Sequence, residues 1–270
     1  MNKGGRGLVA FVFLFVLLLA SPGRGDTPNP NMGLEIMKKA RGLYGGEDQR
    51  STVTLRLINK GGDERRIVTQ RFWKSYGGKD GFDSKTLFFT EYPPDAKGVG
   101  FLIWDYSEPG RPDGLWLYLP TLRTTRPLST RDQNDAFMGS DLTFGDMGQR
   151  RLDEDQHVLV KEETLQGVSC YVVESTPKEA GGIYSKKLVW VSKADSTILK
   201  IDYYDVKKEL LKTQALEWQR VGKALVFKKM EVTNVQTQHK TIYEISDLKI
   251  DSGLRDEDFT ERVLKTGLRR

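Results

Sequence analysis

The sequence contains few of the side chains from which reactive and metal-binding sites are usually built. Its 270 residues include one cysteine and two histidines. A single cysteine excludes an internal disulfide framework and a zinc site made of thiolates. His157 and His239 have no neighbours at metal-ligand spacing, so we expect both at the surface and predict neither a metal site nor a cofactor. Cys170 alternates with apolar residues, which favours a small core residue over a nucleophile.

Motifs that indicate catalysis are missing as well. No phosphate-binding glycine loop and no Gly-x-Ser-x-Gly nucleophile motif occurs. A glycosidase stays open as an alternative, because aspartates cluster at Asp132, Asp135, Asp141 and Asp146. Such an enzyme needs two carboxyl groups facing each other across a cleft, which clustering in sequence does not establish. Ser140 or Asp141 also suits the N-cap of a helix that begins at Leu142. We therefore expect a protein that is not an enzyme.

Long apolar runs are absent apart from one near the N-terminus. Lys3 and Arg6 precede an unbroken run of 13 apolar residues, Leu8 to Ala20, and small residues follow at 21–25. This pattern predicts a secretory signal peptide over residues 1–25, because the run is short for a membrane span. An uncleaved N-terminal anchor is the alternative. No cysteine directly follows the run, which argues against a lipid-modified N-terminus, and we expect the mature protein in the periplasm.

Charge of one sign is not concentrated either. The formal net charge is +5, from 42 basic and 37 acidic residues. Removal of residues 1–25 takes away Lys3, Arg6 and Arg24, which leaves 39 basic residues against 37 acidic ones. A protein that binds nucleic acid concentrates positive charge on one face, and this near balance gives little support for such a partner.

The rest of the chain is dominated by alternating apolar and polar residues. Residues 26–32 are rich in Pro and Asn and are predicted to form a linker, and Gly33 to Leu43 has the spacing of one amphipathic helix. From Thr52 onward the period becomes two, and Gly, Pro, Asp and Asn separate the strands at hairpin distances. The predicted strands are Thr52–Ile58, Glu64–Trp73, Lys85–Tyr92, Val99–Tyr106, Leu115–Leu119, Val158–Leu165, Ser169–Ser175, Lys187–Val191, Ile198–Tyr204, Leu211–Arg220, Leu225–Val235 and Lys240–Ile250. They indicate one antiparallel sheet in a single domain, residues 33–270.

Several predicted strands are apolar on both faces. Phe101 and Ile103 point away from Leu102 and Trp104, and the leucines of Leu115–Leu119 point away from Trp116 and Tyr118. One interpretation is a curved sheet with one face covered by helices or loops and the other lining a cavity. The other is a two-layer sandwich with an ordinary packed core. Periodicity alone does not decide between them.

The segment Asp135–Arg150, DAFMGSDLTFGDMGQR, interleaves large apolar residues with Gly, Ser and Asp. Methionine adapts to varied shapes, so these residues suit a site for an amphipathic molecule. Three arginines precede the segment, namely Arg123, Arg126 and Arg131. They are either a solvated loop or a rim of guanidinium groups that binds phosphate or carboxylate head groups.

Residues 115–147, LWLYLPTLRTTRPLSTRDQNDAFMGSDLTFGDM, resemble the middle segment of the outer-membrane lipoprotein-sorting protein family, a branch of the LolA/LolB-like superfamily. The resemblance extends more loosely from the helix near Gly33 to the C-terminal strands. Leu142, Phe144 and Gly145 depart from the family pattern, in which Phe, Tyr and an acidic residue are common at these places. The first two changes keep the apolar character of the segment.

The resemblance implies a mainly β fold, in which a strongly curved antiparallel half-barrel is closed by helices and a lid around a hydrophobic cavity. It implies a periplasmic carrier or chaperone that binds acyl chains of lipoproteins or other lipids for transfer toward the outer membrane. An inner-membrane transporter of the resistance-nodulation-division type or an outer-membrane acceptor would be its membrane partner. The alternative is a sensor or assembly module that partners such a transporter or another envelope complex.

The residues predicted for this site form two groups. The cavity and lid residues are Phe101, Ile103, Trp104, Trp116, Tyr118, Phe137, Met138, Leu142, Phe144 and Met147. The head-group rim consists of Arg123, Arg126 and Arg131. Within this interpretation, the glycines and aspartates of the segment permit movement and capping, and its apolar residues cover the mouth of the cavity.

Overall fold

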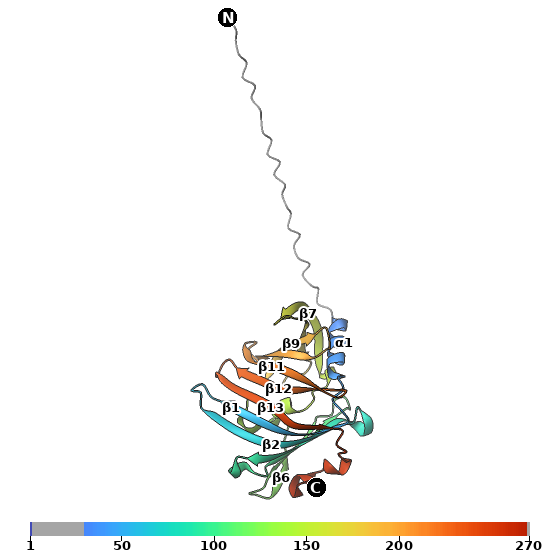
Figure 1. The fold of residues 1–270 in the computed structure, drawn as a ribbon, viewed down its shortest axis with the longest axis vertical. Helices are drawn as coiled ribbons and strands as arrows, with labels where there is room; N and C mark the ends of the chain where they lie inside the picture. Colours follow the sequence, from blue (N-terminus) through green and yellow to red (C-terminus); the bar gives the residue numbers. More distant parts are fainter. Residues whose placement is uncertain (2–29, 269–270) are drawn as a thin grey trace.

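The structure, a computed structural model, describes Met1 and residues 30–268 and consists mainly of one curved antiparallel sheet (Figure 1). The predicted signal peptide, apart from Met1, and residues 26–29 of the predicted linker lie outside the described residues. No helix within residues 30–268 is long and apolar enough to cross a membrane.

Thirteen strands and two α-helices form the described part of the chain, together with several single 3-10 turns. The helices are α1 (Pro30–Arg41) and α2 (Glu261–Thr266). The strands are β1 (Asp48–Ile58), β2 (Glu64–Ser75), β3 (Phe82–Tyr92), β4 (Gly100–Tyr106), β5 (Gly114–Leu119), β6 (Thr124–Pro127), β7 (Asp155–Leu165), β8 (Val168–Pro177), β9 (Tyr184–Ser192), β10 (Ile198–Asp205), β11 (Leu210–Val221), β12 (Ala224–Asn234) and β13 (His239–Ile250).

The observed elements follow the predicted ones closely, but α1 is shifted and the short helix α2 has no predicted counterpart. Helix α1 begins at Pro30, inside the predicted linker, and ends at Arg41. Strand β6 has no predicted counterpart, because its four residues, TTRP, are mostly exposed and lack an alternating apolar pattern. Its pairing with β5 holds it in the sheet.

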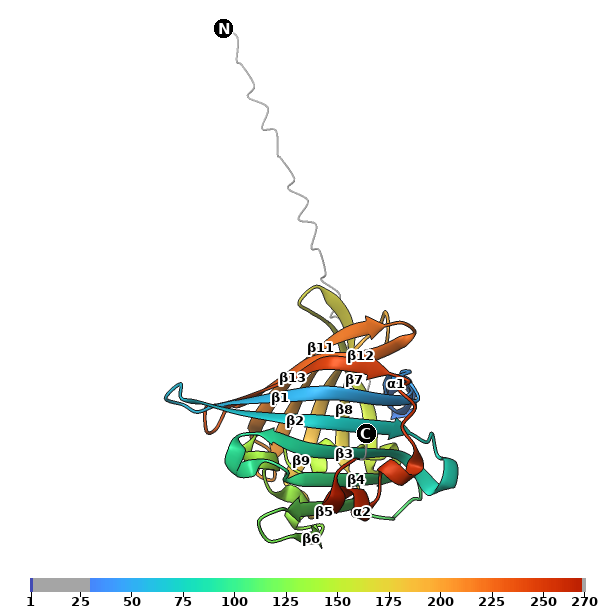
Figure 2. The same cartoon turned by 60° about the horizontal axis from the view of Figure 1, so that its bottom comes forward.

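The strand order is β6-β5-β4-β3-β2-β1-β13-β12-β11-β10-β9-β8-β7, and the neighbouring strands are antiparallel. Because β1 pairs with β13, the two halves of the chain meet in the middle of the sheet. The sheet bends so that β7–β9 lie behind β1–β5 (Figure 2). The predicted curved antiparallel sheet is therefore confirmed, and the two-layer sandwich is wrong.

The two apolar faces of the strands have different coverings. On β4, Phe101 and Ile103 point to the concave inner face, whereas Leu102 points to the outer face and packs with residues of the C-terminal segment. Leu254, Phe259 and Leu264 of that segment are buried there, and α2 lies across the outer face of the sheet (Figure 2). The C-terminal segment thus explains why a single sheet carries apolar side chains on both sides.

Helix α1 packs beside β7 at the other side of the molecule (Figure 1). Ile36 and Ala40 are buried against Leu159 and its neighbours on β8 and β9. Gly33 permits the close approach, because a Cβ atom there would lie 2.7 Å from the His157 carbonyl oxygen. The helix is therefore held directly on the backbone of β7, and its C-terminal end reaches the open side of the half-barrel.

Candidate functional site

A cavity of about 1090 Å³ lies between the C-terminal end of α1 and the concave face of the sheet. We call it the α1 cavity. Its apolar wall includes Trp73, Trp218, Leu225, Phe227 and Ile245. These side chains come from β2, β11, β12 and β13, so the long-range pairing of β1 with β13 brings the wall together. The backbone N–H of Leu225 donates to the Tyr44 carbonyl oxygen at 2.8 Å, which fixes the chain after α1 to β12.

Arg71 lies beside these apolar residues, and further charged residues such as Lys38 and Lys74 also line the cavity. Arg71 lines the cavity from β2, on the same face as Ile67 and Trp73. Arg71 Nη1 donates to Gln49 Oε1 at 2.8 Å. Burial lowers the pKa of the Arg71 guanidinium, although this group remains charged in proteins.

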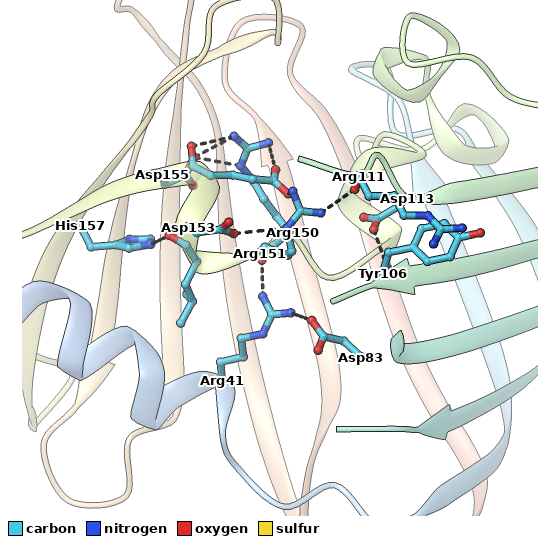
Figure 3. Close-up of polar contacts among 12 residues, drawn as sticks. Arg41, Asp83, Tyr106, Arg111, Asp113, Arg150, Arg151, Asp153, Asp155 and His157 are labelled. Carbon is cyan, nitrogen blue, oxygen red and sulfur yellow. Dashed lines mark hydrogen bonds and ion pairs between the residues drawn. The ribbon is translucent and has the colours of Figure 1, made fainter. Parts of the chain in front are cut away.

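The mouth of the cavity is closed on one side by an arginine of α1. Arg41 Nη2 binds Asp83 Oδ2 at 2.6 Å, and Arg41 Nη1 donates to the Arg150 carbonyl oxygen at 2.5 Å (Figure 3). Arg150 in turn forms ion pairs with Glu154 at 2.8 Å and with Asp155 at 2.9 Å. We call Arg41, Asp83 and Arg150 the mouth latch, because they join α1, the start of β3 and the segment before β7.

Two carboxyl groups lie side by side near the latch. Asp105 is fully buried, and its oxygens accept bonds from the Ser84 hydroxyl and from the Gln149 N–H. Burial raises the pKa of Asp105 above its ordinary range. Asp113 accepts a bond from the Tyr106 N–H at 3.1 Å, and burial, followed by the negative charge of Asp105, raises its pKa to about 7.

We predict that Asp113→Asn flattens the dependence of stability on pH. An unfolded aspartate titrates near 4, so between about pH 4 and 7 the folded protein binds one proton more than the unfolded chain. The folded state is therefore stabilised at the acidic end, and this contribution is lost as pH rises through 7. Relative to Asp113→Asn, the parent should lose about 2 kcal/mol of unfolding free energy between pH 5 and pH 8. Urea unfolding at pH 5 and at pH 8 measures this loss. An equal change in unfolding free energy for the parent and for Asp113→Asn would contradict the prediction.

The histidines differ from their prediction. His157 is buried, and its ring contacts Ser175 Oγ at 2.8 Å and the Leu152 carbonyl oxygen at 3.0 Å, so its predicted surface position is wrong. Burial lowers the pKa of His157. His239 is half-buried and lies 2.7 Å from Asp141 Oδ2. Cys170 is fully buried, as predicted. No cluster of three or more potential metal ligands occurs within residues 30–268.

The clustered aspartates bind neighbouring protein groups. Asp146 accepts bonds from Lys212 at 2.8 Å and Tyr184 at 2.7 Å, and Asp141 accepts one from the Thr241 hydroxyl at 2.7 Å. The predicted helix beginning at Leu142 is wrong, since only single 3-10 turns occur at 137–139 and 145–147. These long-range contacts hold the segment in a compact, non-helical form.

The structure divides the predicted cavity and lid residues between the two faces of the sheet. Seven of them form one cluster on the concave face, namely Phe101, Ile103, Phe137, Met138, Leu142, Phe144 and Met147. Trp104, Trp116 and Tyr118 pack on the outer face with the C-terminal segment. The ten predicted residues do not line the α1 cavity. Whether the segment 137–147 acts as a lid stays a prediction.

The predicted head-group rim lies on the surface. Arg123, Arg126 and Arg131 are exposed around β6 and do not line the α1 cavity. Conversely, Arg71, Trp73, Trp218 and Phe227 are not among the predicted cavity residues. The alternation in β2 places Arg71 on the same face as Ile67, and an inward arginine in a strand is the one local signal that points to this site.

The fold and the cavity can be compared with known proteins. A domain described as an outer membrane lipoprotein-sorting protein, from Vibrio parahaemolyticus, is 29% identical, with a TM-score of 0.82 over 88% of this chain and 100% of that one. A DUF1329 family protein from Desulfovibrio piger is 28% identical, with a TM-score of 0.82 over 87% of this chain and 98% of that one. A LolA superfamily protein from Nitrosomonas europaea shares the fold, with 19% identity and a TM-score of 0.66 over 84% and 97% of the two chains.

Two comparisons of the sequence complement those of the structure. None of the curated proteins matches the chain. A family model with the description "-like: Uncharacterized protein" matches residues 82–266, which is more than half of the chain. The chain therefore belongs to this family, and its LolA-like fold agrees with its resemblance to the outer-membrane lipoprotein-sorting proteins.

Proposed function

We propose that the protein is a periplasmic carrier that binds the apolar chain of a lipid or lipoprotein in the α1 cavity, for transfer toward the outer membrane. The observation that carries the proposal is the cavity itself. Its volume of about 1090 Å³ lies just above the range typical of small-molecule sites, which is about 300–1,000 Å³. Its apolar wall would remove a bound chain from water, and each buried CH₂ contributes about 0.8 kcal/mol.

Two further observations support a carrier. The sheet is not closed, since β6 and β7 are its free edges, and the cavity borders the mouth latch that joins α1 to the sheet. An ion pair at a partly exposed mouth contributes little stability, so opening it requires little free energy. The relative from Vibrio parahaemolyticus is described as a lipoprotein-sorting protein, which supports the same class of cargo.

The direct test is organic extraction of the purified protein followed by mass spectrometry of the extract. A carrier should release lipid in proportion to protein, and the emptied protein should bind fluorescent fatty-acyl probes. An extract without lipid, together with no probe binding by the emptied protein, would contradict the proposal and favour a sensor or assembly module.

We predict that Leu225→Trp blocks the cavity. The larger ring occupies part of the space where an acyl chain would lie, while the backbone bond from residue 225 to Tyr44 is retained. Probe affinity should fall roughly tenfold, which corresponds to about 1.4 kcal/mol. Val206→Trp is the matched control, because Val206 is exposed in the turn between β10 and β11 and does not line the cavity. Equal probe affinity for the two variants would place the acyl chain elsewhere.

A further inference from the structure

Arg71 is a cation with few partners on the wall of the α1 cavity, beside its apolar residues. Of the five N–H groups of its guanidinium, the described bond to Gln49 Oε1 uses one. It makes no ion pair with a carboxylate within residues 30–268. By contrast, Arg41 is paired with Asp83, and Lys212 with Asp146. A partly buried charge without a counter-charge is unfavourable, so Arg71 is prepared for an anion that the protein itself does not supply.

The groups around Arg71 are hydrogen-bond donors. Ser51 is its direct cross-strand partner on β1, is 3% exposed, and has a hydroxyl with no hydrogen-bond partner in the structure. Tyr243 lies close enough that the positive charge of Arg71 acts on its hydroxyl, which makes no described hydrogen bond. Neither residue lines the α1 cavity, so the N–H groups of Arg71 are the donors that an acceptor in the cavity would meet there.

Asp105 does not act as the counter-charge of Arg71. Its charge acts on Arg71, but from beyond ion-pair distance. Its two oxygens already accept bonds from the Ser84 hydroxyl and the Gln149 N–H. A bound oxyanion would therefore meet an uncompensated guanidinium.

We propose that Arg71, positioned by Gln49, binds the carboxylate of a single-chain amphipathic cargo of the fatty-acid class, whose apolar chain lies against Trp73, Trp218 and Phe227. This proposal rests on the proposed carrier function. A guanidinium binds a carboxylate through two parallel N–H bonds, and one positive charge balances one negative charge. A phosphate monoester carries more charge than one arginine neutralises, so the carboxylate is the better match.

The test uses the mature protein after removal of bound lipid, titrated calorimetrically with three amphipaths of equal chain length. These are hexadecanoate, hexadecanol and hexadecyl phosphate, at a pH at which the carboxyl group is ionised. We expect hexadecanoate to bind at least tenfold more tightly than hexadecanol. Arg71→Gln should remove this difference while leaving hexadecanol binding within about twofold. Arg66→Gln is the matched control, since Arg66 is exposed on the same strand and should change neither affinity.

The outcomes separate the two proposals. Equal binding of hexadecanoate and hexadecanol by the parent protein would overturn the head-group site while leaving the carrier intact. Binding of none of the three would overturn both. Tighter, Arg71-dependent binding of hexadecyl phosphate would overturn the choice of a carboxylate. Because Arg71→Gln removes a charge without a partner, the thermal midpoint of the empty protein should not fall. A clear fall with unchanged selectivity would show that Arg71 is a structural residue.

Discussion

Replacing Lys212 by methionine is expected to lower the free energy of unfolding by about 3–5 kcal/mol. The side chains of Lys212 and Asp146 are only 3% and 8% exposed, and their charged atoms lie 2.8 Å apart. Burial acts to raise the pKa of Asp146, but the positive charges of Lys212 and Lys187 and the hydrogen bonds to the carboxylate together outweigh it, and the pKa is lowered. Methionine preserves the length of the side chain and leaves the carboxylate buried without its main partner.

The loss should exceed that of an ordinary ion pair because Asp146 binds several elements at once. Its Oδ2 accepts bonds from the Tyr184 hydroxyl at 2.7 Å and from the Thr143 N–H at 2.9 Å. Lys212 Nζ also donates to the Asp141 carbonyl oxygen at 2.6 Å. The pair therefore fixes the segment 137–147 to β9 and β11 on the concave face.

Lys229→Met is the control for this experiment. Lys229 and Glu217 are also on neighbouring strands, but they lie 3.7 Å apart and are 30% and 64% exposed. This pair should contribute less than about 1 kcal/mol. Chemical denaturation of both variants gives the comparison. The double replacement Lys212→Met with Asp146→Leu should lose less than the sum of the single changes, because no charge is left unpaired. Similar small losses for both lysine variants would contradict the role assigned to Lys212.

The fold was largely predictable because the alternation of apolar and polar residues that defines each strand is a local property of the sequence. Alternation places Val53, Leu55 and Leu57 on one face of β1, and all three are buried there. The apolar side chains on both faces of β4 do not indicate which part of the protein covers each face. Phe101 and Trp104 look alike in sequence, yet one packs under the segment 137–147 and the other under residues that follow β13. That choice depends on long-range contacts, of Phe101 with Phe137 and of Trp104 with Phe259, which lies 155 positions away.

The candidate site was less predictable for the same reason. Arg71 and Gln49 meet Trp218 and Phe227 only after β1 has paired with β13. No spacing of residues along the sequence predicts such a cavity. The segment Asp135–Arg150 stands out by its composition, and the sequence predicts local caps for its aspartates. Asp146 does accept the local bond from the Thr143 N–H, but it also binds Lys212, which lies 66 residues away in the sequence.

The last prediction concerns whether the segment 137–147 is core or lid. Phe137 is 1% exposed, and its ring lies 5.0 Å from Phe101, 5.7 Å from Phe88 and 5.7 Å from Phe144. Phe137→Ala should therefore lower the free energy of unfolding of the empty protein by about 3–5 kcal/mol, as truncation of a buried phenylalanine does. Phe144 is half-buried at the edge of the same cluster, and Phe144→Ala should cost about 1–2 kcal/mol.

The comparison of these two variants with and without an acyl probe separates the two roles. If Phe137 anchors the segment while Phe144 can move, the probe should stabilise the parent and the Phe137 variant by equal amounts. Phe144→Ala would then lose part of that stabilisation, because a ring that turns onto a bound chain contributes only when the chain is present. Denaturant unfolding at saturating probe measures both quantities. Equal losses for the two variants, unchanged by the probe, would make the whole segment a permanent part of the core and would exclude a lid at this place.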